Sequence, residues 1–124
     1  MATLEHVNIT VKDADLIAQK LVALFDWSIR WSGAAMEKGR TVHVGTENSY
    51  IALYSQGGTQ ALGNSYLSPG GLNHIGIVVD DLVAAEARIK SAGYTPQNHA
   101  DYEPGKRFYF DFDDGVEIEV IAYD

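Results

Sequence analysis

The first information in this sequence comes from what it lacks: cysteine, an excess of positive charge, and long hydrophobic runs. Without any cysteine in 124 residues, the chain can form no disulfide and no thiolate metal site, and it has no catalytic thiol. Nine Lys and Arg residues stand against seventeen Asp and Glu residues, which gives a formal net charge of −8. Such an acidic chain argues against nucleic acid as a partner.

No stretch approaches the ~20 consecutive apolar residues that span a bilayer. The N-terminal sequence MATLEHVN has no basic segment followed by an apolar core and a cleavage site, so it is not typical of an export signal. We therefore expect a cytoplasmic protein with no membrane partner. Hydrophobic residues make up 46% of the chain and charged residues 21%, which is typical of a globular protein whose length suits a single domain.

What the sequence does contain is a repeat. HVNITVKD begins at His6 and HIGIVVDD begins at His74, and the spacing between these histidines equals that between Asp13 and Asp81. In each copy, β-branched apolar residues alternate with other residues, as in a half-buried strand. Each copy ends at an aspartate that could cap a helix. Chance is the simpler explanation, because many strands that lead into helices share these features. The equal spacing favours two equivalent modules instead.

Both halves predict the same order of elements, βαβββ. In the first half, periodicity predicts a strand at 4–11 and a helix at 13–25, and strand-like runs separated by Gly, Asn or Ser predict strands at 27–32, 40–44 and 50–54. In the second half the same order is predicted, with a strand at 74–79, a helix at 81–92 that ends before Gly93, and strands at 95–97, 108–112 and 116–121.

The segment SQGGTQALGNSYLSPGG between the halves is rich in Gly, Ser and Asn, which predicts a flexible connection. We therefore expect one α+β domain over residues 1–124. Its first module covers about 1–56, its linker about 57–70 and its second module about 71–124. In each module the helix would cover one face of the sheet, and the open face would carry the histidine.

Three stretches carry a resemblance to a known family. LEHVNITVKD and LNHIGIVVDD open the two modules, and FYFDFDDGVEIEV closes the second. Together they resemble the vicinal oxygen chelate superfamily, which contains glyoxalase I, extradiol dioxygenases, fosfomycin-resistance transferases and bleomycin-binding proteins. The resemblance covers essentially the whole chain. It implies two paired βαβββ modules in a curved, incomplete, eight-stranded barrel, a small-molecule substrate or ligand, and a homodimer whose modules pair within a chain or exchange between chains.

The resemblance also implies a divalent-metal centre. Carried over by position, its ligands are His6, His74 and Glu119. Two imidazoles and one carboxylate suit Zn, Ni, Mn or Fe(II), and they leave coordination positions for water or substrate. Glu117 lies two residues earlier on the same strand face and is the alternative carboxylate. Taken singly, each residue has an ordinary alternative, a solvated side chain without a ligand.

One position departs from the glyoxalase I pattern. Ala52, in the run SYIALYS, stands where the resemblance places a second glutamate. Alanine can neither ligate a metal nor accept a proton, so the two-carboxylate arrangement that serves that isomerisation is missing. The three-ligand pattern is more similar to the fosfomycin-opening transferases and the extradiol dioxygenases. Lyase, isomerase, transferase and dioxygenase chemistry stay open, and no catalytic residue is assigned.

Strand alternation also predicts side chains that line a pocket near the metal. The expected substrate-binding residues are Asn8, Thr10, Tyr50, Tyr54, Arg107 and Tyr109. Arg107 or Lys106 would hold an anionic group on an oxygen-rich substrate. His43 and His99 match no motif position, and we expect both at the surface.

The alternative function is a metal-free protein that sequesters an antibiotic, of the bleomycin-resistance type. A net charge of −8 would suit the capture of a cationic drug. The joint presence of His6, His74 and Glu119 favours a metal-dependent enzyme, because a sequestering protein needs none of them.

Overall fold

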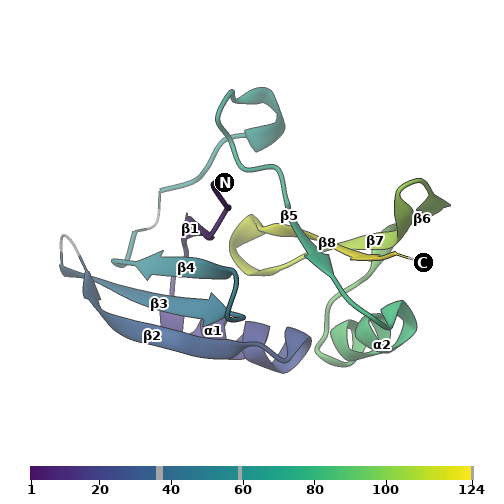
Figure 1. Cartoon of the computed structure of the whole chain (residues 1–124). Helices are drawn as coiled ribbons and strands as arrows, with labels where there is room; N and C mark the ends of the chain where they lie inside the picture. Colours follow the sequence, from purple (N-terminus) through teal and green to yellow (C-terminus); the bar gives the residue numbers. More distant parts are fainter. Residues whose placement is uncertain (36–37, 59, 124) are drawn as a thin grey trace. The chain divides into compact units, whose positions relative to one another are not determined.

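The computed structural model describes residues 1–35, 38–58 and 60–123. The chain divides into two compact units, Met1–Gln60 and Ala61–Asp124. Each unit has the order βαβββ, with one four-stranded mixed sheet and one α-helix (Figure 1). This order confirms the predicted α+β class and the internal repeat. Neither sheet closes on itself, as expected of modules from an incomplete barrel. No helix within the described ranges is long and apolar enough to cross a membrane.

The first module has the strand order β1-β4-β3-β2. Its elements are β1 (His6–Thr10), α1 (Ala14–Phe25), β2 (Ser28–Ala35), β3 (Gly39–Gly45) and β4 (Tyr50–Ser55). Strand β1 runs parallel to β4, and the other pairs are antiparallel. Helix α1 packs mainly on β3 and β4. The buried apolar side chains of these three elements are Ala14, Ile17, Ala18, Leu21, Leu24, Phe25, Val42, Val44, Ile51, Ala52 and Leu53.

Because α1 packs mainly on β3 and β4, the edge strand β1 is less covered than the sequence predicts. Val7, expected on a buried face, is 37% exposed. Val11, just beyond the strand, is buried at 5%. The apolar face of β1 is therefore only partly buried, although its alternation is that of a half-buried strand.

The second module repeats this topology with the order β5-β8-β7-β6. Its elements are β5 (Ile75–Val78), α2 (Leu82–Ser91), β6 (Gln97–Tyr102), β7 (Gly105–Asp111) and β8 (Glu117–Ala122). Strand β5 is parallel to β8, and the remaining pairs are antiparallel. The buried apolar side chains of the module are Ile77, Ala85, Ile89, Phe108, Phe110, Phe112, Ile118, Val120 and Ile121.

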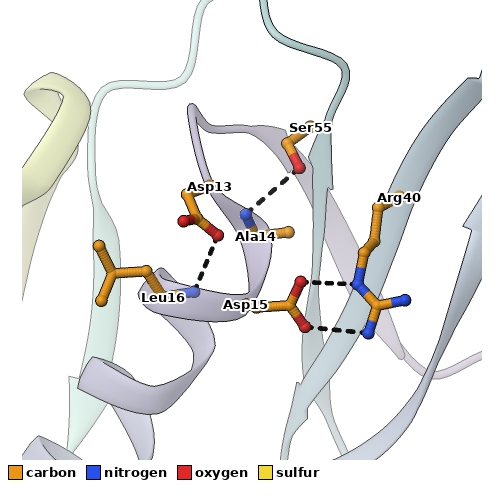
Figure 2. Close-up of polar contacts among 6 residues, drawn as sticks. All are labelled: Asp13, Ala14, Asp15, Leu16, Arg40 and Ser55. Atoms are coloured by element: carbon orange, nitrogen blue, oxygen red, sulfur yellow. Dashed lines mark hydrogen bonds and ion pairs between the residues drawn. The ribbon is translucent and has the colours of Figure 1, made fainter.

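The two aspartates of the repeat cap the two helices. The Asp13 carboxylate accepts a hydrogen bond of 3.1 Å from the backbone N–H of Leu16 (Figure 2). Asp81 accepts one of 3.0 Å from Ala84. Each satisfies a backbone donor that the first turn of a helix leaves unpaired. The aspartate therefore occurs in both copies because each module starts its helix at the same point.

An ion pair between Asp15 and Arg40 connects the start of α1 to the sheet. Arg40 on β3 donates two hydrogen bonds to Asp15, of 2.6 Å from Nε and 2.9 Å from Nη2 (Figure 2). The hydrogen bond from Arg40 holds the pKa of Asp15 below its ordinary value. Because both side chains are exposed, this pair fixes geometry more than it stabilises the fold.

Removal of either cap should destabilise its module by a similar amount. We expect Asp13→Ala and Asp81→Ala each to lower the free energy of unfolding by about 1 kcal/mol, the usual contribution of an aspartate N-cap. Chemical denaturation followed by circular dichroism measures this. Asp80→Ala is the matched control, because Asp80 is exposed and lies outside the cap position. An equal loss in Asp80→Ala would contradict the capping role.

Part of the connection between the modules is folded locally. It contains a short 3-10 helix, η2 (Ser65–Leu67), whose Asn64 side chain accepts a 3.0 Å hydrogen bond from Tyr66 N–H. Ser68 Oγ donates to the Asn64 carbonyl at 2.9 Å. A Cβ on Gly71 would lie 2.7 Å from the Ser65 carbonyl oxygen, so this turn requires glycine. Composition suggested flexibility, but the Asn and Ser side chains here fold the backbone locally.

Candidate metal centre

The second module brings together two of the three expected ligands. His74 lies just before β5, and Glu119 lies on β8, its parallel neighbour. His74 Nε2 is 3.1 Å from Glu119 Oε1. Two ligands that are each ~2.1 Å from one metal are themselves roughly 3.0–3.4 Å apart. The pair therefore fits a shared divalent cation.

The face of β8 that carries this site agrees with strand alternation. Ile118 and Val120 are buried at 1% and 0% exposure, whereas the Glu117 and Glu119 side chains retain 22% and 13%. Glu117 Oε1 lies 3.9 Å from His74 Nδ1, on the other nitrogen of the ring. His74 Nδ1 is buried and has no hydrogen-bond partner among the residues described. One imidazole therefore faces two carboxylates, one at each ring nitrogen.

Strand β7 places Arg107 and Tyr109 beside this pair. Arg107 Nη1 is 3.6 Å from Glu119 Oε2, and its side chain is 12% exposed. The same guanidinium donates to the backbone carbonyls of Gly105 at 3.3 Å and Tyr102 at 3.1 Å. Two backbone carbonyls therefore hold the Arg107 side chain in place, and its positive charge offsets that of Glu119. A role in binding an anionic substrate stays a prediction.

Tyr109 lies edge-on to His74, with 5.6 Å between ring centroids. Tyr109 is also paired in register with Glu119 across β7 and β8. Burial raises the pKa of Tyr109, and the nearby charge of Glu119 raises it further. The phenol therefore keeps its proton at neutral pH and can donate a hydrogen bond.

Tyr66 is a member of this cluster that the sequence did not indicate. Its hydroxyl donates a hydrogen bond to the Glu117 carboxylate, and that bond is the main cause of the raised pKa of Tyr66. The residue belongs to η2, in a segment that composition marked only as a flexible connection. No regular sequence spacing relates Tyr66 to Glu117, so the sequence alone could not predict this contact.

The first module holds the third expected ligand, His6. Its Nδ1 is 2.8 Å from Glu5 Oε1, and its ring stacks on Tyr50 with 4.8 Å between centroids. An ionised carboxylate can only accept a hydrogen bond, so Nδ1 carries a proton, and in the neutral ring Nε2 is the nitrogen with a lone pair for a metal. The hydrogen bond from His6 also holds the pKa of Glu5 below its ordinary value.

His43 was expected at the surface, and the structure places it elsewhere. It is only partly exposed, stacked on Tyr50 at 4.6 Å and close to Trp31 at 5.2 Å. Burial lowers the pKa of His43. His43 lies on the same face of β3 as Thr41, which is buried. No sequence motif indicated that this face of the strand would be covered. His99 is exposed as predicted, and it pairs with Glu86 at 2.9 Å.

A bulge in β2 completes this face. The pairing of β2 with β3 shifts between Ile29 and Trp31. Such an extra residue re-aims side chains, and here Arg30 lies over the Tyr50 ring at 4.3 Å while Trp31 lies beside His43. This face of the sheet therefore carries the rings of Trp31 and His43 in addition to the expected His6 and Tyr50. The Arg30 guanidinium lies over the Tyr50 ring.

The remaining expected pocket residues of the first module share this face. By register, Asn8 pairs with Ala52 and Thr10 with Tyr54. Asn8 and Thr10 are exposed, and Tyr54 donates to Gln56 Oε1 at 3.1 Å. Ala52 itself is buried at 2% exposure, so a small side chain fills the position where a second glutamate would stand.

Within the described parts of the chain, no three His, Asp or Glu side chains are already grouped as a metal-binding set. His74 with Glu119 forms a two-ligand arrangement in one module, and His6 offers a single ligand in the other. The donor chemistry fits a divalent metal that takes both nitrogen and oxygen ligands. Each module by itself is incomplete as a metal site.

The sequence matches the family model of the Glyoxalase/Bleomycin resistance protein/Dioxygenase superfamily over residues 5–110. The chain belongs to this superfamily. This confirms the resemblance drawn from the repeated histidine motifs. Among curated proteins, none matches the chain.

Solved structures share the fold over the whole chain. A glyoxylase/bleomycin resistance protein/dioxygenase domain from Frankia sp. EAN1pec is 21% identical, with a TM-score of 0.82, and the match covers 100% of this chain and 99% of that one. The fosfomycin resistance protein FosX of Listeria monocytogenes is 18% identical, with a TM-score of 0.78 and coverage of 100% and 95%. TnmS3, an antibiotic binding protein from Streptomyces sp. CB03234, is 16% identical, with a TM-score of 0.74 and coverage of 100% and 98%. At these identities the likeness shows the fold alone.

Solved structures that share this fold include some with a metal and one of an antibiotic-binding protein. Listeria FosX has been solved in complexes with Mn(II), one of which also holds 1S,2S-dihydroxypropylphosphonic acid. TnmS3 is described as an antibiotic binding protein. A protein solved with bound Mn(II) and a protein described as antibiotic binding therefore share this fold.

Proposed function

We propose that this superfamily member is a divalent-metal-dependent enzyme that acts on a small, oxygen-rich substrate able to chelate the metal. The observation that supports this most directly is the convergence of His74 Nε2 and Glu119 Oε1 at 3.1 Å. His6 supports it from the other module, because Glu5 holds its Nδ1 at 2.8 Å and leaves Nε2 with a lone pair. Zn, Ni, Mn and Fe(II) all suit this set of ligands.

In this proposal His6, His74 and Glu119 hold the metal. When bound, a divalent metal polarises a carbonyl, enolate or diol oxygen of the substrate. Arg107 lies 3.6 Å from Glu119 and offsets its negative charge. Tyr109 retains its phenolic proton and donates it in a hydrogen bond to a substrate oxygen.

The substrate would contact residues from both modules. We propose Asn8, Thr10, Tyr50, Tyr54, Arg107 and Tyr109 for this role, the set expected from strand parity. Lyase, isomerase, transferase and dioxygenase chemistry each remain compatible with it. Among these reactions, the isomerisation of glyoxalase I is the least suitable, because it uses a two-carboxylate arrangement and Ala52 provides no carboxylate.

Antibiotic sequestration is the second candidate, and one observation favours it. The first module carries a row of His6, Tyr50, His43 and Trp31 rings in contact across its sheet. Aromatic side chains of this kind commonly line sites for flat or cationic ligands. The row needs no metal, so this function predicts ligand binding that a chelator leaves unchanged.

Metal content separates the two functions. We expect untagged protein, analysed by mass spectrometry after reconstitution with Zn, Ni, Mn or Fe(II), to retain about one metal per chain, as three protein ligands of one centre imply. A screen of diols, catechols and hydroxyketones should then find turnover that a chelator abolishes. Protein that retains none of the four metals, yet binds a cationic aromatic drug with or without chelator, would establish sequestration instead.

The proposal includes a cytoplasmic homodimer without a nucleic-acid or membrane partner. The net charge of −8 argues against a nucleic-acid partner. Exchange of modules between the two chains would pair His6 of one protomer with His74 and Glu119 of its partner.

A further inference from the structure

Each motif histidine has a carboxylate at the ring nitrogen away from its proposed metal-binding atom. For His6 that carboxylate is Glu5, at 2.8 Å from Nδ1. For His74 it is Glu117, at 3.9 Å from Nδ1. Histidines that bind metals usually donate their other N–H to a carboxylate or carbonyl, which fixes the tautomer and the ring orientation.

The two carboxylates occupy different positions in the repeat. Glu5 directly precedes His6, but the matching residue before His74 is Asn73, whose amide carries no charge. In the second module the carboxylate comes from β8 instead, where Glu117 is held by the Tyr66 hydroxyl. The buried Nδ1 of His74 has no hydrogen bond within the described residues. Two different positions of the repeat thus place a carboxylate near the Nδ1 atom of each histidine, at hydrogen-bond distance in the first module and at 3.9 Å in the second.

We propose that Glu5 and Glu117 are positioning residues, which orient the imidazoles of His6 and His74 so that each presents Nε2 to the metal. This inference rests on the proposed metal centre and deepens it. Tyr66 has an indirect role, because its hydrogen bond fixes the carboxylate of Glu117. Glu119 then remains the ligand, and Glu117 stays outside the coordination sphere.

The proposal assigns a proton to a stated atom in each state. In the metal-free protein, His74 Nε2 faces Glu119 at 3.1 Å, so its neutral ring carries the proton on Nε2. When Nε2 donates its lone pair to the metal, the single proton must reside on Nδ1, where Glu117 accepts it. His6 carries its proton on Nδ1 in both states, because Glu5 accepts it already.

Side-chain ¹⁵N NMR of the histidines tests this directly, without any activity measurement. Spectra are recorded at about pH 8, well above the ordinary histidine pKa of ~6.5, before and after addition of Zn(II) alone. We expect His74 to change from the Nε2–H to the Nδ1–H tautomer and His6 to keep Nδ1–H throughout. A His74 that binds Zn(II) through Nδ1 would overturn the proposal.

Competition against a chromophoric chelator measures the contribution of each carboxylate to Zn(II) affinity. We expect Glu5→Gln and Glu117→Gln each to weaken binding by about 10- to 100-fold, the usual effect of losing such a partner. Tyr66→Phe should weaken it less, because the charge of Glu117 remains. Glu86→Gln is the matched control, since Glu86 contacts His99 at 2.9 Å outside the site, and it should have wild-type affinity. Circular dichroism establishes that every variant is folded.

The outcomes separate this inference from the proposed function. Unmutated protein that binds none of the four metals would overturn both. Tight binding that depends on His74 and Glu119, but is unchanged in Glu5→Gln and Glu117→Gln, would overturn the positioning roles and leave the metal centre intact. Loss of all binding in Glu117→Ala with retention in Glu119→Ala would make Glu117 the ligand and overturn the inference.

Discussion

Replacement of His74 by alanine should weaken Zn(II) binding by more than about 100-fold. A ligand contributes more than its outer partner, and loss of such a partner alone costs about 10- to 100-fold. The substitution removes the nitrogen that lies 3.1 Å from Glu119 Oε1. The remaining carboxylate is partly offset by Arg107, 3.6 Å away, which makes it a poorer ligand. Chelator competition and metal analysis of the folded variant measure the loss.

The same measurement on His99→Ala provides the control. His99 also contacts a glutamate, Glu86 at 2.9 Å, but it is exposed and belongs to no repeated motif. We expect its affinity for Zn(II) to be unchanged. Glu119→Gln should follow His74→Ala, because an amide oxygen is a weaker ligand than a carboxylate. If His74→Ala bound Zn(II) as tightly as wild type while Glu117→Ala did not, the proposed ligand set would be wrong.

The helices and the central strands of both sheets carry buried apolar residues, and these runs made their positions predictable from the sequence. Not every such strand alternates, because Ile51, Ala52 and Leu53 on β4 are all buried. Strand β6 (Gln97–Tyr102) was predicted only at 95–97, because QNHADY has no sustained apolar alternation. It is an edge strand held by backbone pairing to β7. Pairing of this kind leaves no hydrophobic signal.

The residues found around the two motif histidines fall into two groups. Those placed by parity, such as Glu119 and Tyr109, lie beside His74 because adjacent strands in register bring them together. Tyr66 and Arg30 could not be predicted in this way. Tyr66 belongs to a connection, and Arg30 reaches Tyr50 through a bulge that breaks the alternation. Contacts that depend on a turn or a bulge have no period to reveal them.

The largest effect on stability is expected from Phe110→Ala in the second module. Phe110 has 0% exposure, and its ring lies 5.5 Å from Tyr94 and 6.3 Å from Phe112. Truncation removes a large apolar side chain and leaves a cavity, which costs about 3–5 kcal/mol of unfolding free energy. Denaturation in the presence of a chelator measures this without a contribution from bound metal.

The shape of the transition adds a second result. Each module has its own set of buried residues, so unfolding in one step would mean that the modules depend on each other. In that case Phe110→Ala should shift the whole transition, and Asp13→Ala should shift the same transition by less. Val83→Ala is the control, because Val83 is 81% exposed on α2 and should change stability by less than about 0.5 kcal/mol. A loss below about 1 kcal/mol in Phe110→Ala would contradict its place in the core, since buried phenylalanines cost several times more.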